Sequence, residues 1–336
     1  HRGVGPGRGH RRLMRVAIVG SGPAGFYAAE HLLKQNDADR TDPGREAEEP
    51  VRIEVDMFDR LPTPFGLVRA GVAPDHPKIK SVIRMYEKTA ARPGFRFFGG
   101  VDIGGDLSVA ELSAHYNAVI YAYGTATDRS LGIPGEELPG SHAATEFVAW
   151  YNAHPDFADR EFDLDCKRAV VIGNGNVAAD VARMLALTRE ELEGTDTADH
   201  AIDVLAGSGI EEIVVVGRRG PAQAAFTNPE VRELGEMLDA DVIVDPGEAE
   251  LDALSRDWLE SEEADPTNRR NVELFQGFAA REPGGKPKRI VLRFLRSPVE
   301  IRGDDRVRSI VLARNELVRD ESGAIRAGDT GERGEL

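Results

Sequence analysis

The chain has 336 residues, which predicts two domains at about 150 residues per domain. Its formal charge of −16, from 42 Lys and Arg against 58 Asp and Glu, argues against a nucleic-acid binder that neutralises phosphates over a broad surface. A single cysteine, Cys166, excludes an intramolecular disulfide, a redox-active cysteine pair, an iron–sulfur cluster and a cysteine-rich zinc site, so redox chemistry would require a bound cofactor.

The first domain is predicted from about residue 14 onward. Residues 1–13 are rich in arginine and contain no acid; we interpret them as a disordered or non-native leader, with a mitochondrial presequence as the alternative. Hydrophobic patterning then predicts a buried strand at 15–19, a helix at 22–34 and a strand at 51–58, with an exposed loop at 36–50. No apolar run is long enough to span a membrane.

The same order of elements returns in the second half of the chain, as a strand at 169–172, a helix at 176–187 and a strand at 212–216. Further strands are predicted at 241–245, 271–278, 289–301 and 307–318. The last two form an antiparallel hairpin in this interpretation, and the acidic segment before residue 266 is a solvated helix or loop. The predicted fold class is α/β, with two parallel sheets and additional antiparallel strands.

A glycine-rich motif lies between the first predicted strand and helix. Its glycines, Gly20, Gly22 and Gly25, have the GxGxxG spacing that provides a tight turn, close backbone approach to a pyrophosphate and close helix–strand packing. The helix N-terminus adds N–H donors and a positive dipole for the phosphates. The next strand ends at Asp59, whose carboxylate could accept hydrogen bonds from a ribose diol, and Asp56 is the competing acid.

A second motif, Gly173-Asn-Gly-Asn-Val-Ala178, occupies the equivalent place in the second unit, with alanine for the third glycine. The strand that follows ends at Arg218 and Arg219 instead of an acid. Guanidinium groups suit the dianionic 2′-phosphate of NADP, although two solvated loop arginines are the simpler alternative. The first site therefore suits a nucleotide with an unphosphorylated adenosine ribose, and the second suits one with a 2′-phosphate. This division favours FAD in the first domain and NADPH in the second, because a flavin can accept a hydride and release single electrons.

The sequence resembles the ferredoxin-NADP reductases of the adrenodoxin reductase type, which include actinobacterial NADPH-ferredoxin reductases. The most specific matching segment is LPTPFGLVRAGVAPDHPKIK at 61–80. Other matches are IPGEELPG at 133–140, VVIGNGNVAADVAR at 170–183, VVGRRGPAQAAFTNPEVREL at 215–234 and RFLRSPVEI at 293–301. The resemblance extends from about Met14 to the last residue.

The resemblance also implies site residues that spacing does not reveal. For FAD it adds Ala24, at the pyrophosphate turn, with Leu67 and Ile103 lining the cofactor. For NADP it adds Asn174, Gly175, Asn176, Val177 and, near the nicotinamide, Glu230. His76 and Glu233 correspond to the family's active-site pair, which we interpret as positioning the nicotinamide rather than transferring protons. No metal site is predicted.

The implied domain layout is discontinuous. Residues 14–127 form the N-terminal part of an FAD-binding domain, 128–325 an inserted NADP-binding domain, and 326–336 the start of a return to the FAD domain. In the family the returning chain continues and packs on the flavin, so we expect this sequence to be a C-terminally truncated piece. The alternative function is therefore a non-catalytic NADP(H)-binding module with an incomplete flavin site.

The function implied by the resemblance is electron transfer from NADPH through FAD to a ferredoxin-type iron–sulfur protein. Neither a nucleic-acid partner nor a membrane span is expected. A bacterial protein of this kind would be cytoplasmic, and a eukaryotic one would lie in the mitochondrial matrix.

Overall fold

The computed structural model describes residues 12–38, 51–125 and 127–336. The chain divides into two compact units. The first unit comprises His1–Val72 and His76–Thr127, and the second comprises Ala73–Asp75 and Asp128–Leu336. The three residues Ala73–Asp75 therefore belong by their contacts to the second unit, although the chain on both sides of them belongs to the first.

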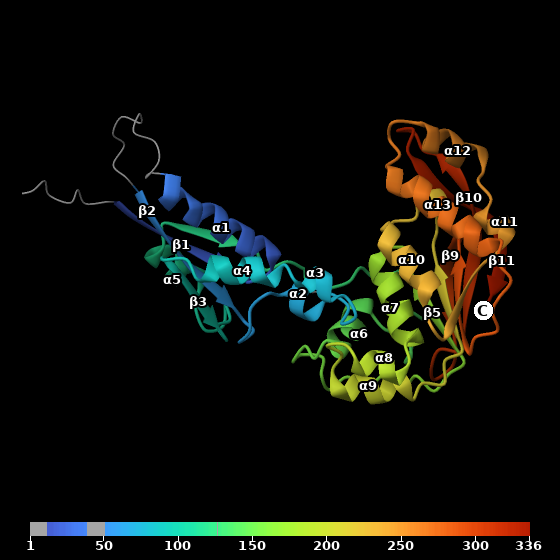
Figure 1. The fold of residues 1–336 in the computed structure, drawn as a ribbon, viewed down its shortest axis with the longest axis horizontal. Coiled ribbons are helices and arrows are strands. Elements are labelled where there is room, and N and C mark those ends of the chain that lie inside the picture. Colours follow the sequence, from blue (N-terminus) through green and yellow to red (C-terminus); the bar gives the residue numbers. More distant parts are fainter. Residues whose placement is uncertain (1–11, 39–50, 126) are drawn as a thin grey trace, which may run out of the picture. The chain divides into compact units, whose positions relative to one another are not determined.

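A four-stranded parallel sheet forms the centre of the first unit, in the order β3-β2-β1-β4 (Figure 1). Side chains alternate between its two faces, as the period of a strand requires. Val16 and Ile18 of β1 pack toward α1 and α4 in one apolar cluster, and Ala17 and Val19 pack toward α5 in another. The strands are β1 (Arg12–Val19), β2 (Val51–Asp59), β3 (Phe95–Gly99) and β4 (Ala118–Tyr121).

The second unit contains a parallel sheet in the order β5-β6-β8-β7 and an antiparallel sheet in the order β11-β10-β9 (Figure 1). Helices cover one face of the parallel sheet, and the antiparallel sheet packs on the other face through Ile301, Ile310 and Leu312. The strands are β5 (Arg168–Ile172), β6 (Glu212–Val216), β7 (Ala240–Val244), β8 (Lys288–Arg293), β9 (Arg296–Arg302), β10 (Ser309–Arg319) and β11 (Ile325–Glu335).

Short helices connect the strands in both units. Those of the first unit are α1 (Pro23–Ala38), α2 (Leu67–Ala70), α3 (Pro77–Lys80), α4 (Ile83–Ala90) and α5 (Val109–His115). Those of the second are α6 (Ala144–Tyr151), α7 (Asn176–Ala186), α8 (Arg189–Glu193), α9 (Asp199–Ala206), the 3₁₀ helix η1 (Pro221–Gln223), α10 (Asn228–Glu236), α11 (Pro246–Ala249), α12 (Ala253–Glu260) and α13 (Pro266–Ala279). Among the described residues, no helix is both long and apolar enough to cross a membrane.

The predicted α/β fold, with two parallel sheets and antiparallel strands, is confirmed. One predicted strand is wrong, because residues 271–278 lie within helix α13. Its buried residues Val272, Phe275 and Phe278 are spaced three apart, which places them on one helical face. Asp265 caps the helix N-terminus by accepting a hydrogen bond from the Thr267 N–H.

The predicted long strand at 289–301 is two strands that belong to different sheets. β8 completes the parallel sheet and β9 begins the antiparallel one. Leu295 lies between the two strands and has a positive φ of 54°, in the left-handed region. The pattern of apolar residues does not predict this break between the strands. The predicted hairpin that follows is confirmed, with β9 paired antiparallel to β10.

Three predicted boundaries also differ from the structure. Residues 326–336, expected to start a return to the first domain, lie in the second unit, where β11 pairs with β10. Arg12 and Leu13, predicted as part of a leader at 1–13, lie in β1; the rest of that predicted segment, residues 1–11, lies outside the described part of the chain. The predicted loop at 36–50 begins with the last residues of α1, and its residues 39–50 are likewise outside the described part.

Candidate functional site

The glycine-rich turn of the first unit has the tight geometry that the motif predicts. Gly20 adopts a φ of +106°, and a Cβ on Gly25 would lie 2.1 Å from the Gly20 carbonyl oxygen. A Cβ on Gly22, by contrast, would meet nothing within 4 Å. Gly20 and Gly25 are therefore required by the fold of the turn, whereas Gly22 leaves open space at the start of α1, where Ala24 is exposed.

Asp59 and Asp56 have different surroundings, which separates the two candidate acids of the first unit. The Asp59 carboxylate accepts hydrogen bonds from the Ser21 N–H at 2.8 Å and the Leu61 N–H at 2.9 Å, so it lies at the glycine-rich turn. Asp56 is only 1% exposed and accepts hydrogen bonds from Arg15, Arg96 and the Tyr116 hydroxyl. Burial opposes ionisation of Asp56, but these donors outweigh it and lower its pKa. Asp56 is a structural acid.

The segment before α2 packs directly on the same turn. The Phe65 N–H donates to the Ser21 carbonyl oxygen at 3.0 Å, and a Cβ on Gly66 would lie 2.9 Å from the Gly22 Cα. Leu67, which follows, is 65% exposed. Ile103 is half-buried in the apolar cluster on the α5 face of the sheet. The structure thus brings Leu67 to the turn and places Ile103 at the sheet surface.

The second glycine-rich turn joins β5 to α7. Gly173 has a φ of +136°, and its N–H donates to the Val216 carbonyl oxygen at 2.9 Å. The Asn174 carbonyl accepts from the Ala225 N–H, and the Asn176 Oδ1 accepts from the Thr227 N–H at 2.8 Å. A Cβ on Gly173 would still lie 3.9 Å from the Ala178 Cβ, so alanine fits at the third glycine position.

Two features of this second turn point to a ligand. The buried Nδ2 of Asn174 has no hydrogen-bond partner among the described residues, and a buried amide donor is expected to have one. The Val177 side chain, at the first turn of α7, is 54% exposed. An anionic group bound at the helix N-terminus would complete this arrangement.

Arg218 and Arg219 follow β6, and their backbone is held in place. The Asn315 Nδ2 donates to the Arg218 carbonyl at 2.8 Å, and the Leu295 N–H donates to the Arg219 carbonyl at 3.1 Å. Within the described chain, neither guanidinium group makes a hydrogen bond or ion pair. Burial, together with the charges of Arg218 and Arg326, lowers the pKa of Arg219. These are the properties of a site for a dianion.

A buried arginine that sequence reasoning missed connects other candidate residues of the second unit. Arg183 on α7 has a side chain only 2% exposed and bonds to Asp75, Asp180 and Glu230, with 2.6 Å between its Nη1 and the Glu230 carboxylate. Its Nη1 also lies 3.7 Å from Glu233. The sequence offered one signal for this buried charge, namely an arginine within an apolar stretch of the predicted helix 176–187.

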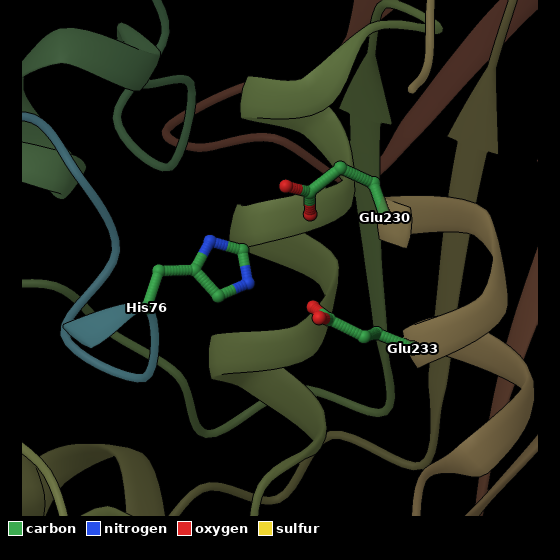
Figure 2. Close-up of side chains that lie close together, drawn as sticks. All are labelled: His76, Glu230 and Glu233. Atoms are coloured by element: carbon green, nitrogen blue, oxygen red, sulfur yellow. The ribbon is translucent and has the colours of Figure 1, made fainter. Parts of the chain in front are cut away.

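The two carboxylates of α10 project from the same side of that helix, one turn apart (Figure 2). Glu230 is buried and Glu233 is half-buried. His76, also labelled in Figure 2, forms the N-cap of α3 and follows Asp75 directly in the chain.

Comparison with known proteins places the chain in a family. Residues 14–214 match the family described as pyridine nucleotide-disulphide oxidoreductase. The NADPH-ferredoxin reductase FprA of Mycobacterium leprae is 52% identical over 324 residues, which are 96% of this chain and 68% of that protein. The mitochondrial NADPH:adrenodoxin oxidoreductase of Salvelinus fontinalis is 41% identical over 334 residues, covering 95% of this chain and 62% of that protein.

A solved structure agrees with these matches. Mycobacterium tuberculosis FprA in complex with NADPH has a TM-score of 0.87 and 52% sequence identity to this chain, covering 97% of it and 69% of the FprA chain. The one cysteine of the present sequence provides no dithiol for the disulphide chemistry in the broader family's description. The chain therefore belongs to the NADPH-ferredoxin reductases, within the pyridine nucleotide-disulphide oxidoreductase family.

Proposed function

We infer that this chain is an NADPH-dependent flavoprotein reductase, which passes electrons from NADPH through FAD to a ferredoxin-type iron–sulfur protein. The observation that carries this function is the difference between its two glycine-rich turns. The first lies beside the carboxylate of Asp59, and the second leads to the guanidinium groups of Arg218 and Arg219, which have no hydrogen-bond or ion-pair partner among the described residues. An acid suits a ribose diol, and an arginine pair suits a 2′-phosphate.

FAD is proposed to lie along the turn of the first unit. The open space at Gly22 accommodates the pyrophosphate, and Asp59 accepts hydrogen bonds from the adenosine ribose. Ala24 stands at the pyrophosphate turn, and Leu67 and Ile103 supply apolar contacts. When bound, the flavin accepts a hydride and releases electrons one at a time.

NADPH is proposed to bind the second unit with its pyrophosphate at the N-terminus of α7. The N–H groups of that first turn, from Gly175 to Val177, and the unpartnered Asn174 Nδ2 supply donors for the phosphates. Glu230 lies toward the nicotinamide end in this proposal, where its ion pair with Arg183 fixes its carboxylate.

His76 and Glu233 are proposed as positioning residues for the nicotinamide. The support for His76 is its place in the segment at 61–80 that matches the family, and the support for Glu233 is that its carboxylate lies 3.7 Å from the Arg183 Nη1. Hydride transfer depends steeply on the alignment of the two reacting rings, so residues that fix alignment affect its rate. A cytoplasmic location is also proposed, on the strength of the mycobacterial relatives.

The experiment is a visible absorption spectrum of the purified chain, before and after FAD is added, followed by anaerobic titration with NADPH and with NADH. We expect a flavin spectrum that NADPH bleaches more readily than NADH, and that oxidised ferredoxin restores. A colourless protein that binds NADPH but takes up no FAD would contradict the proposal and favour the non-catalytic NADP(H)-binding module.

A further inference from the structure

A cavity of about 420 Å³ lies in the second unit and is lined in part by Arg219 and by Ala225, whose N–H donates to the carbonyl oxygen of Asn174 in the glycine-rich turn. It lies between η1, the start of α13 and the turn that joins β10 to β11, and its wall includes Trp258 of α12. This volume is within the range of small-ligand sites, about 300–1,000 Å³.

The lining of the cavity is cationic. Three arginines, Arg219, Arg319 and Arg326, contribute to it, and Glu263 is the one acid among its lining residues in the described chain. The charge of Arg326 acts on Arg219, since together with burial and Arg218 it lowers the pKa of the Arg219 guanidinium. Cations held together in this way are stabilised by a bound anion.

The turn that presents Arg326 is internally ordered. The Asp320 carboxylate accepts hydrogen bonds from the N–H groups of Ser322 and Ala324 and from the Nε of Arg326, the last at 2.8 Å. Since Asp320 engages Nε, the terminal nitrogens of Arg326 remain for a ligand. The strand β10 is also joined to the Arg218 backbone through Asn315, which fixes the hairpin beside the arginine pair.

We propose that the turn between β10 and β11 forms one wall of the site for the 2′-phosphorylated adenosine of NADPH, with Arg326 as a specificity-determining residue beside Arg219. This inference rests on the proposed function of the second unit. The cavity accommodates the adenine, with Trp258 as an aromatic surface, while the phosphate lies among the guanidinium groups. The Arg326 guanidinium binds the 2′-phosphate and does not bind the adenine.

The test uses isothermal titration calorimetry of the purified chain with 2′,5′-ADP and with 5′-ADP, which lacks the 2′-phosphate. Arg326→Ala is compared with Arg333→Ala, a matched control. Both arginines lie exposed on β11, and each is paired with an acid, Asp320 and Asp329 respectively. Arg333 does not line the cavity.

We expect Arg326→Ala to weaken binding of 2′,5′-ADP by about 10-fold or more and to leave 5′-ADP binding unchanged, because one charge-assisted hydrogen bond is lost. Arg333→Ala should change neither. Equal binding by Arg326→Ala and the unsubstituted chain would overturn the inference, as would an equal loss for both nucleotides. If the unsubstituted chain binds neither 2′,5′-ADP nor NADPH, the proposed function of the unit itself fails.

A second readout locates the adenine. The chain has two tryptophans, and Trp150 is buried in the helical core while Trp258 lines the cavity. We expect 2′,5′-ADP to quench tryptophan fluorescence and Trp258→Phe to abolish the quenching while binding by calorimetry persists. Quenching that survives in Trp258→Phe would place the adenine elsewhere.

Discussion

Arg183 on α7 binds Asp75 through two hydrogen bonds, from Nε to Oδ2 at 3.0 Å and from Nη2 to Oδ1 at 3.1 Å, although 108 residues separate them in the chain. The pair holds Ala73–Asp75 within the second unit. Burial alone would disfavour a charged guanidinium, but Asp75, Asp180 and Glu230 outweigh it and raise the pKa of Arg183. The arginine therefore stays charged and neutralises a buried group of acids.

Arg183→Met is expected to lower the free energy of unfolding by about 3–5 kcal/mol, because it leaves buried carboxylates without their cation. Urea unfolding followed by tryptophan fluorescence measures the change. Arg189→Met is the control, since Arg189 is exposed and its ion pairs with Glu193 and Asp203 lie at the surface. A loss no larger for Arg183→Met than for Arg189→Met would contradict this account of the network.

His76→Gln is expected to slow NADPH-dependent bleaching of the flavin by up to about 100-fold, because misalignment of reacting groups has effects of that size. The dissociation constant for NADPH should stay the same, since Arg218 and Arg219 supply that binding in the proposed function. Stopped-flow absorbance gives the rate and its NADPH dependence separately. His115→Gln, at the exposed end of α5, is the control; weaker NADPH binding without a slower limiting rate would contradict a positioning role.

Gly22→Ala and Gly25→Ala should have opposite consequences for the first unit. A Cβ on Gly25 would lie 2.1 Å from a backbone oxygen, so Gly25→Ala should destabilise the fold whether or not FAD is present. A Cβ on Gly22 meets open space, so Gly22→Ala should leave stability within about 1 kcal/mol while weakening FAD binding. Thermal unfolding and flavin titration distinguish them, and undiminished FAD binding by Gly22→Ala would argue against a pyrophosphate there.

Asp56→Asn is expected to lower the free energy of unfolding at pH 7 by about 1–3 kcal/mol, because hydrogen bonds to a charged group are lost. The pKa of Asp56 is lowered in the folded chain, so its contribution to stability is present above the unfolded pKa of about 3.9 and disappears as the pH falls toward the folded pKa. Urea unfolding at pH 7 and near pH 3 should therefore show a smaller difference between the two chains at the lower pH. If the two chains differed by the same free energy of unfolding at pH 7 and near pH 3, the result would contradict a stabilising role for the ionised Asp56 carboxylate.

Arg218→Ala combined with Arg219→Ala is expected to reduce the preference for NADPH over NADH by about 1.5–3 kcal/mol for each hydrogen bond lost to the 2′-phosphate. Binding of NADH should change little, because that nucleotide has no 2′-phosphate. Titration of the paired variant with both nucleotides measures the preference. An unchanged ratio of the two dissociation constants would refute the assignment of these arginines.

The sequence by itself determined both glycine-rich turns, the two candidate acids at the end of the strand after the first turn, and the arginine pair that follows the strand after the second. These features are local: strand, turn, helix and next strand follow one another, so the physical needs of the turn can be read directly from consecutive residues. The strand pairs β1–β2 and β5–β6 also follow from that local order.

Only the tertiary structure decided which distant groups meet. Asp56 and Asp59 are both acids near the end of one strand, and their roles separate only because Arg15, Arg96 and Tyr116 converge on the first. The Arg183–Asp75 pair and the approach of Arg326 to Arg219 join residues far apart in the chain. Such contacts depend on side-chain burial and on how sheets pack, which hydrophobic periodicity does not encode. The strand wrongly predicted at 271–278 is a different kind of error, because the spacing of Val272, Phe275 and Phe278 was a helical signal in the sequence.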